Sequence, residues 1–515
     1  MRQGRVPEVT AIKFRHCHRN ADLRESLRQE HPFGGLGARA KAVQVDDPGH
    51  AARVILPWDP KPLQEWGLQT VHPFVARPHL TVLAQSLPIL GSLLAEPLTG
   101  LIDTAFVARL GAEALAALGV GTMVLSTVFW SFSFLGVATQ TKVATLCGEE
   151  ALAGSPGRSA ARMCLVAVLV ALLMGAAAAA VGWALSESIA RGMGAEGEVQ
   201  DLTVDYLLWR FIGAPALLAS FAAFGALRGA QDMRTPLLVA GGMNALNVAL
   251  DPLLIFGMAG LPAMGVAGAA LASAISQWIG AAWAIAAAFR RLGWPDALDL
   301  HPIRGLLSAG VHLVFRAVSL NAFLILGTRK ATLIGVGAGA VHQVIRSVWF
   351  FNALFLDSFA ILGQSLIAYF LGNGDRGTGR DVARVVCQWS LATGAVLGVV
   401  MLVAEPWMLR LYIPASAAAL FAAPWRIAAA CQPISGLTFG TDGVHFGTAD
   451  FRFLRNVVLA ALVAGGAVIV WADASSPWAL NAVWWSFMVW TSLRAVAGML
   501  RVWPGRPDAP LGTGA

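Results

Sequence analysis

The sequence predicts an all-α integral membrane protein with twelve transmembrane helices in two six-helix bundles, related by a parallel pseudo-two-fold repeat. Hydrophobic residues make up 57% of the 515 residues and charged residues only 13%, too little charge for a soluble surface of this size. Apolar runs of about 20 residues or more, enough to cross a bilayer, recur from residue 80 onward. A glycine-rich motif also occurs at corresponding places in the two halves.

The first segment, residues 1–79, is polar, mixed in charge and rich in Pro and Gly. It contains no apolar stretch of the secretory-signal kind, so we expect a disordered cytoplasmic extension. An N-lobe at residues 80–290, a C-lobe at residues 304–500 and a cytoplasmic tail at residues 501–515 should follow.

The apolar runs must be helices, because lipid offers no hydrogen-bond partner to an unpaired backbone. The expected spans are approximately 80–107, 113–147, 160–186, 199–226, 235–258, 264–289, 305–333, 339–371, 383–408, 416–441, 454–472 and 479–500.

Arginines concentrate in the loops that follow even-numbered spans, as at Arg158, Arg234, Arg290, Arg376 and Arg452. Positive loops stay in the cytoplasm, so both termini should be cytoplasmic. These loop arginines account for the net charge of +7, so we expect no nucleic-acid partner. The plasma (inner) membrane is the expected location, with an organellar membrane as the alternative.

The repeat is most evident at the ends of spans 4 and 10. Gly, Gly, Asp and Arg recur there at an offset of 218 residues (443 − 225): Gly225, Gly229, Asp232 and Arg234 match Gly443, Gly447, Asp450 and Arg452. A weaker echo has an offset of 224: Gln140 and Gly148 match Gln364 and Gly372. Six spans per half give both halves the same orientation, an arrangement that suits rocking around a central cavity.

Ionisable residues at span depth are costly and usually functional. Asp103 lies late in span 1, with Glu96 two helical turns earlier on the same face and Pro97 predicting a kink. Alternatively, Asp103 lies near the membrane–water interface and is hydrated from outside. Glu96 could likewise extend toward water or line a cavity without binding the transported ion.

Span 5 carries a polar stripe of Asn244, Asn247 and Asp251, spaced so that all three share one helix face. Such oxygens could bind Na⁺, or the acid could bind H⁺. The alternative for Asp251 is a bend residue before Pro252.

Further charges lie within other spans. Asp357 lies in the middle of span 8. Asp442 lies at the end of span 10, where it could either cap the loop or have a functional role. Arg210 in span 4 and Arg316 in span 7 have interhelical anchoring as their alternative role.

These residues lie in motifs that resemble the MATE (multidrug and toxic compound extrusion) family, and within it the DinF-like branch, over about residues 80–500. Span 1 reads PLTGLIDTAFVARLG from Pro97 to Gly111, and Ala108 stands where the family usually has Gly. Span 4 contains RFIGAP from Arg210, span 5 contains LDP at 250–252, and span 8 contains His342-Gln343.

The resemblance implies a cation-coupled (H⁺ or Na⁺) antiporter that exports small organic, often cationic or amphipathic, compounds by alternating access. It assigns Asp103, Asn247 and Asp251 to cation coupling, with Ser273 as the span-6 hydroxyl, and Asn244 extends this set. The other branch of the family uses a Glu in span 7, but no acid lies between residues 304 and 330 here.

The remaining candidates belong to the substrate cavity or its gates: Glu96, Pro97, Gln140, Arg210, Arg316, Gln343, Asp357 and Gln364. We expect a monomer in the lipid bilayer with a small-molecule substrate, no cofactor, and no metal beyond Na⁺ at Asp103, Asn247 and Asp251. A lipid or lipid-headgroup flippase of similar two-lobe plan is the alternative. An enzyme is disfavoured, because neither a His-Glu-x-x-His nor a Gly-x-Ser-x-Gly motif is present.

Overall fold

The computed structural model describes residues 43–44, 53–54, 72–154, 158–503 and 509–512, and it divides into two units, Met1–Ala84 and Gln85–Ala515. In the first unit, β1 (Val43–Gln44) pairs antiparallel with β2 (Arg53–Val54). Further along, α3 (Pro73–Ala76) is capped by the His72 ring, whose Nδ1 accepts from the Phe74 N–H at 3.2 Å. The disorder expected for residues 1–79 otherwise concerns positions outside the described residues.

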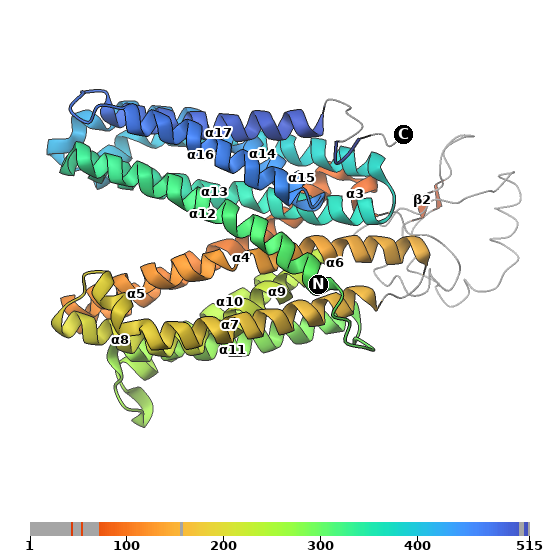
Figure 1. Cartoon of the computed structure of the whole chain (residues 1–515), viewed down its shortest axis with the longest axis horizontal. Helices are drawn as coiled ribbons and strands as arrows, with labels where there is room; N and C mark the ends of the chain where they lie inside the picture. Colours follow the sequence, from red (N-terminus) through yellow and green to blue (C-terminus); the bar gives the residue numbers. More distant parts are fainter. Residues whose placement is uncertain (1–42, 45–52, 55–71, 155–157, 504–508, 513–515) are drawn as a thin grey trace, which may run out of the picture. The chain divides into compact units, whose positions relative to one another are not determined.

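The described part of the second unit is helical (Figure 1). Its first helix, α4, begins in the first unit. The N-lobe contains α4 (Pro78–Val107), η2 (Ala108–Leu110), α5 (Ala112–Ser131), α6 (Phe134–Ala153), α7 (Ser159–Gly192), α8 (Gly197–Ile212), α9 (Ala214–Gly229), α10 (Arg234–Ile255), η3 (Met258–Gly260) and α11 (Gly265–Leu292). The C-lobe contains α12 (Pro302–Ile334), α13 (Val336–Gly372), α14 (Arg376–Tyr412), η4 (Ala415–Leu420), α15 (Ala422–Gly447), α16 (Phe451–Trp471) and α17 (Ala479–Val502).

These helices confirm the predicted twelve-span, two-lobe fold, with two spans built from broken helices. The second span is α5 followed by α6, and the fourth is α8 and α9, bent by 45°. The bend falls at Gly213, two residues before Pro215, which lacks a backbone donor.

Length and composition alone qualify nine described helical stretches as membrane spans, or ten if the bent α8–α9 pair is one span. The two other spans, α15 and α17, contribute the buried Asp442 and Arg494. Their lower hydropathy therefore goes with polar groups that face the protein interior rather than lipid.

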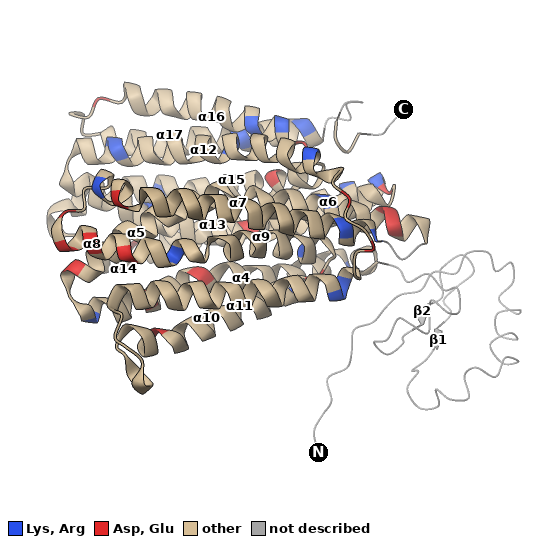
Figure 2. Cartoon of the chain, turned by 60° about the horizontal axis from the view of Figure 1, so that its bottom comes forward, with Lys and Arg blue, Asp and Glu red and all other residues tan. Residues whose placement is uncertain are grey.

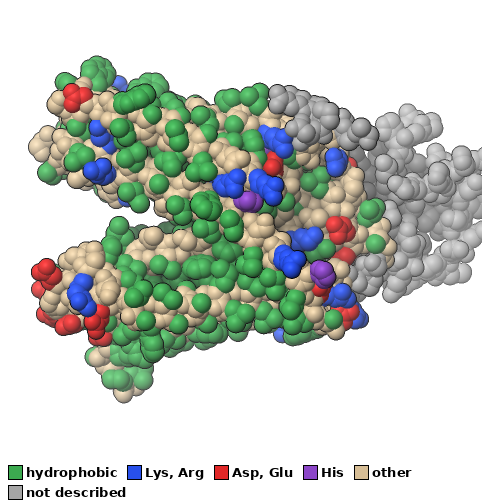
Figure 3. Space-filling model, viewed as in Figure 1, with side chains coloured by type: hydrophobic (Ala, Val, Ile, Leu, Met, Phe, Trp, Pro, Cys, Tyr) green, Lys and Arg blue, Asp and Glu red, His purple; other side chains and the backbone are tan. Residues whose placement is uncertain are grey.

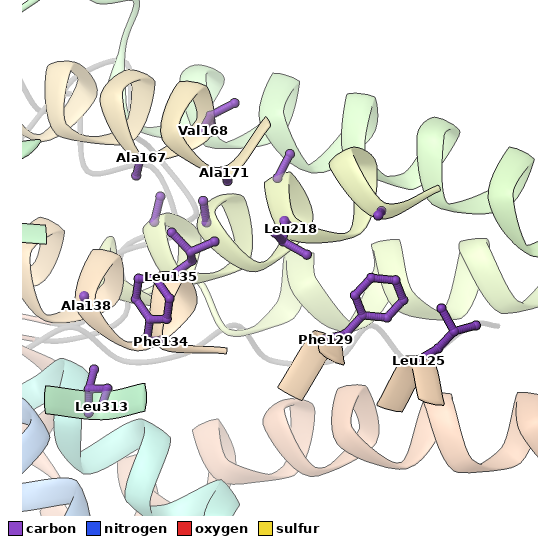
Figure 4. Close-up of a cluster of buried hydrophobic side chains, with 14 of the residues drawn as sticks. Leu125, Phe129, Phe134, Leu135, Ala138, Ala167, Val168, Ala171, Leu218 and Leu313 are labelled. Atoms are coloured by element: carbon purple, nitrogen blue, oxygen red, sulfur yellow. The ribbon is translucent and has the colours of Figure 1, made fainter. Parts of the chain in front are cut away.

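Helices within a lobe approach closely at small residues. Figure 4 shows part of the N-lobe core, where Leu135 of α6, Ala167 of α7 and Leu218 of α9 come together. Gly225 of α9 lies against the Gly136 backbone of α6, with no room for a Cβ. Small residues allow this backbone approach, which is how helices associate in lipid.

The two lobes meet where α6 crosses α13, and the contact obeys the predicted repeat. Gln140 Nε2 donates to the Ile361 carbonyl at 2.7 Å, and Gln364 Nε2 donates to the Val137 carbonyl at 2.7 Å. Both donors and both acceptors are related by 224 residues, so the pair of bonds is reciprocal. We call this crossing the interlobe clasp.

Two glycines extend the interlobe clasp by the same symmetry. A Cβ added to Gly148 would clash with the Tyr369 carbonyl oxygen, and one added to Gly372 would clash with the Thr145 carbonyl oxygen. Glycine is therefore required at both positions while the lobes touch here.

The interlobe clasp lies toward the end of the lobes that carries the arginine-rich loops, which we call the basic end. Figure 2 shows Lys and Arg gathered where α6 ends. The surface is hollowed between the lobes, and this hollow opens away from the basic end (Figure 3). The described conformation is therefore closed at the basic end and open at the other.

Candidate functional site

The coupling residues predicted from the motifs converge on one pocket in the N-lobe. Asn247 lies on α10 between Asp103 of α4 and Ser273 of α11. In the amide orientation that satisfies both of its ends, its nitrogen donates to Asp103 Oδ1 at 3.0 Å. Its oxygen then accepts from the Ser273 N–H at 3.2 Å and from Ser273 Oγ at 3.3 Å. One amide thus connects three helices.

The second acid of the pocket, Asp251, lies one turn after Asn247 and is 0% exposed. Its carboxyl group is within hydrogen-bond reach of the Asp103 carboxyl group. When both acids are ionised, neither Asp251 oxygen has a donor among the described residues. Because a buried charge needs a partner, a proton or a small cation between the two carboxyl groups would complete this site.

Two α8 residues border the pocket. Arg210 interacts electrostatically with both Asp103 and Tyr206. Sequence reasoning missed Tyr206, although the fourth residue before Arg210 on a helix faces the same way. Arg210 therefore lies beside the acid pair and does not line the central cavity, which is where the sequence predicted it.

Three other candidates lie apart from this pocket. Asn244 is half-buried, two turns before Asp251, while Glu96 and Pro97 are exposed on α4. α4 continues through Pro97 as one helix, and the structure does not bring these three side chains into contact with the acid pair.

The helix that carries Asp103 is loosely held. Only 6% of the most apolar stretch of α4 is buried, against 67% for α13, and α4 shares no extensive interface with another described helix. One hydrogen bond that holds α4 is made by Ser92, whose Oγ accepts from Arg228 Nη2 at 3.1 Å. Few contacts therefore hold α4 against the N-lobe, and the hydrogen bond between Asn247 and Asp103 is one of them.

A central cavity of about 420 Å³ lies between the lobes. Four of the predicted cavity residues line it: Gln140, Arg316, Asp357 and Gln364. Glu96, Pro97, Arg210 and Gln343 do not, and Gln343 instead accepts from Arg346 Nη2 at 2.9 Å.

The C-lobe wall of the cavity holds a buried charge triad. Asp442 Oδ2 accepts from Arg316 Nη2 and from Arg494 Nη2, both at 2.6 Å. Sequence reasoning missed Arg494, although an arginine within the apolar run 479–500 was the available signal.

The repeat also shows what the C-lobe lacks. By the offsets of 224 and 218 residues, Asp103 corresponds to Gly327 and Asn247 to Gly465. A Cβ at Gly465 would lie 2.8 Å from the Phe323 ring, which stacks on Trp490 at 4.6 Å between ring centroids. Aromatic rings thus fill the C-lobe equivalent of the acid pocket.

The MatE family model matches residues 88–253. Protein DETOXIFICATION 45, chloroplastic, of Arabidopsis thaliana is 31% identical over 464 residues, covering 84% of this chain and 80% of that protein. DNA damage-inducible protein F of Escherichia coli is 27% identical over 437 residues, covering 81% and 90%. A crystal structure of MATE in the bent conformation superimposes with a TM-score of 0.73 at 19% identity, covering 82% and 93%.

Proposed function

The chain belongs to the MATE family of efflux transporters, and on this basis we propose that it is an H⁺- or Na⁺-coupled antiporter that exports small organic, amphipathic compounds by alternating access. The observation that supports the proposal best is the acid pair, Asp103 and Asp251, at the junction of a loosely packed helix with the N-lobe. No cofactor other than the coupling ion is needed, and the lobes of one monomer suffice.

The proposed coupling step is the docking of α4. Two ionised carboxylates at one buried site repel each other, which favours separation of α4 from α10. A proton or Na⁺ between Asp103 and Asp251 removes the repulsion, so α4 docks. Because substrate and cation favour different packings of α4, each weakens the binding of the other, as thermodynamic reciprocity requires.

The proposed transport step is a rocking of the two lobes. The interlobe clasp closes the basic end, and the cavity opens at the other. If the basic end faces the cytoplasm, as the arginine distribution favours, this conformation is outward-facing and both termini are cytoplasmic. We propose the plasma (inner) membrane, with an organellar membrane as the alternative, since DETOXIFICATION 45 is chloroplastic.

The test is dye efflux from proteoliposomes under an imposed proton gradient and, separately, a sodium gradient. The Asp251→Asn variant keeps the pocket shape but removes the shared charge, so it should lose gradient-driven efflux while still folding. Asp473→Asn, on a loop outside the lobes' interior, is the matched control. Unchanged coupled efflux by Asp251→Asn would refute the proposal.

A lipid or lipid-headgroup flippase is the second candidate, favoured by the arginines on the cavity wall. It predicts gradient-dependent translocation of a fluorescent phospholipid and no efflux of water-soluble dyes. The antiporter proposal predicts the reverse pattern in the same vesicles.

A further inference from the structure

The central cavity has an uneven distribution of charge. Three arginines line it, Arg228, Arg316 and Arg494, against two acids, Asp357 and Asp442, so one formal positive charge is in surplus. Arg228 of the N-lobe and Asp357 of the C-lobe interact electrostatically with each other. The triad of Arg316, Arg494 and Asp442 on the C-lobe wall itself holds two arginines and one aspartate, and Asp357 interacts with Arg316 less strongly than with Arg228.

The triad has more donors than acceptors. One oxygen of Asp442 accepts from both Arg316 and Arg494, and the Nε atoms of these two arginines are buried without an acceptor among the described residues. Arg494 is only 5% exposed. Because a buried guanidinium needs charged or polar partners, a second anionic group beside Asp442 would stabilise this wall.

The rest of the wall beside these guanidinium groups is aromatic. The Arg494 guanidinium carbon lies 4.5 Å from the Trp490 ring centroid, and that of Arg316 lies 4.9 Å from the Phe446 ring centroid. Trp130 and Trp349 also line the cavity. An apolar or aromatic body would therefore find ring contacts next to the site for its charged group.

We propose that the transported compounds are amphipathic monoanions: an aromatic or other apolar body with one carboxylate, sulfonate or phosphodiester, bound at Arg316 and Arg494. This inference rests on the proposed function, because it names the substrate class of the same cavity. It differs from the expectation for cationic substrates, since a cation at this wall would add to the positive surplus.

The experiment compares two probes that differ in charge, 1-pyrenebutyrate and (1-pyrenebutyl)trimethylammonium, on the full chain in nanodiscs. Energy transfer from tryptophan to pyrene reports equilibrium binding, because tryptophans line the cavity. Wild-type protein should bind the anion about tenfold or more tightly than the cation, the size expected of a charge-assisted hydrogen bond.

Two variants shift the affinity in opposite directions. Arg494→Gln removes a donor and should weaken pyrenebutyrate binding about tenfold. Asp442→Asn frees both guanidinium groups from their internal carboxylate and should tighten it. Arg346→Gln is the matched control, because Arg346 is outside the cavity and contacts Gln343. A folding defect would weaken binding in every variant, so tighter binding by Asp442→Asn distinguishes the proposal from such a defect.

Preference for the cation, or weaker anion binding by Asp442→Asn, would overturn the inference. The proposed function is tested separately by Asp251→Asn, which should lose gradient-driven efflux but keep the preference for the anion. Efflux of pyrenebutyrate identifies a free solute as the source of the anionic group. Translocation of fluorescent phosphatidylglycerol identifies a lipid headgroup, and both results support an anionic ligand.

Discussion

At the scale of single residues, the amide of Asn247 is the connecting element of the N-lobe pocket that holds Asp103 and Asp251. It donates to Asp103 on α4 and accepts from Ser273 on α11, so it holds three helices in register. None of these three hydrogen bonds needs a charge on Asn247, so the amide can orient the acid pair in both of its ionisation states.

We expect Asn247→Leu to reduce coupled efflux by about tenfold, the equivalent of one or two lost buried hydrogen bonds. The variant keeps the number and branching of the side-chain heavy atoms but leaves Asp103 without its amide donor. Gradient-driven dye efflux per folded molecule measures the effect. Asn352→Leu controls for loss of a buried amide, since the Asn352 amide lies in the C-lobe and donates to the Met401 sulfur. Equal losses in both variants would contradict the assigned role.

A second residue-scale prediction concerns the loop that joins the lobes. Asp296 in this loop pairs with Arg162 at 2.7 Å and Arg158 at 3.3 Å. These arginines hold the pKa of Asp296 well below its usual range, chiefly through the Arg162 hydrogen bond. A lowered folded pKa means that the contribution to stability is present above the unfolded pKa of about 4 and is lost as the pH falls below it.

Thermal unfolding of Asp296→Asn and wild type, followed from pH 7 downward, checks this dependence. The variant should melt at a lower temperature at pH 7, and the difference should shrink below about pH 4. Asp381→Asn is the control, because its ion pair with Arg384 is highly exposed and contributes little. A difference that persists unchanged at low pH would contradict the explanation.

At the scale of helices, the interlobe clasp depends on glycine. Gly148→Ala should prevent full closure of the basic end, because the new Cβ would clash with the Tyr369 carbonyl. We expect a longer distance between spin labels on α6 and α13 at that end, and slower transport. Gly119→Ala on α5, where a Cβ meets nothing within 4 Å, is the matched control. Wild-type distances in Gly148→Ala would show that the contact is not a gate.

The helix positions were largely predictable, but the breaks and the side-chain partners were not. Long apolar runs predict spans well, because lipid leaves the backbone no alternative to helix. The bend at Gly213 was missed, although Gly and Pro215 were visible, because a neighbouring helix decides whether such a position bends. Asp103 and Asp251 were predicted as a site from motifs, whereas Tyr206 and Arg494 depend on how helices far apart in sequence face each other.

At the scale of the whole second unit, the two halves share a fold but differ in their interiors. The repeat predicted from Gly and Gln positions is realised in the reciprocal bonds of Gln140 and Gln364. The N-lobe has Asp103 and Asn247 where the C-lobe has Gly327 and Gly465, and Phe323 fills the space beside Gly465. This asymmetry supports a division of labour in which the N-lobe binds the cation and the C-lobe wall binds the substrate.

The central claim is that a cation shared by Asp103 and Asp251 controls the docking of α4. The most direct measurement is the distance between spin labels at Leu101 on α4 and Ile279 on α11, both exposed, as the pH is lowered or Na⁺ is added. Wild-type protein should show a shift between two distance populations, and Asp251→Asn should remain in one of them under all conditions. The same shift in Asp251→Asn as in wild type would contradict the claim.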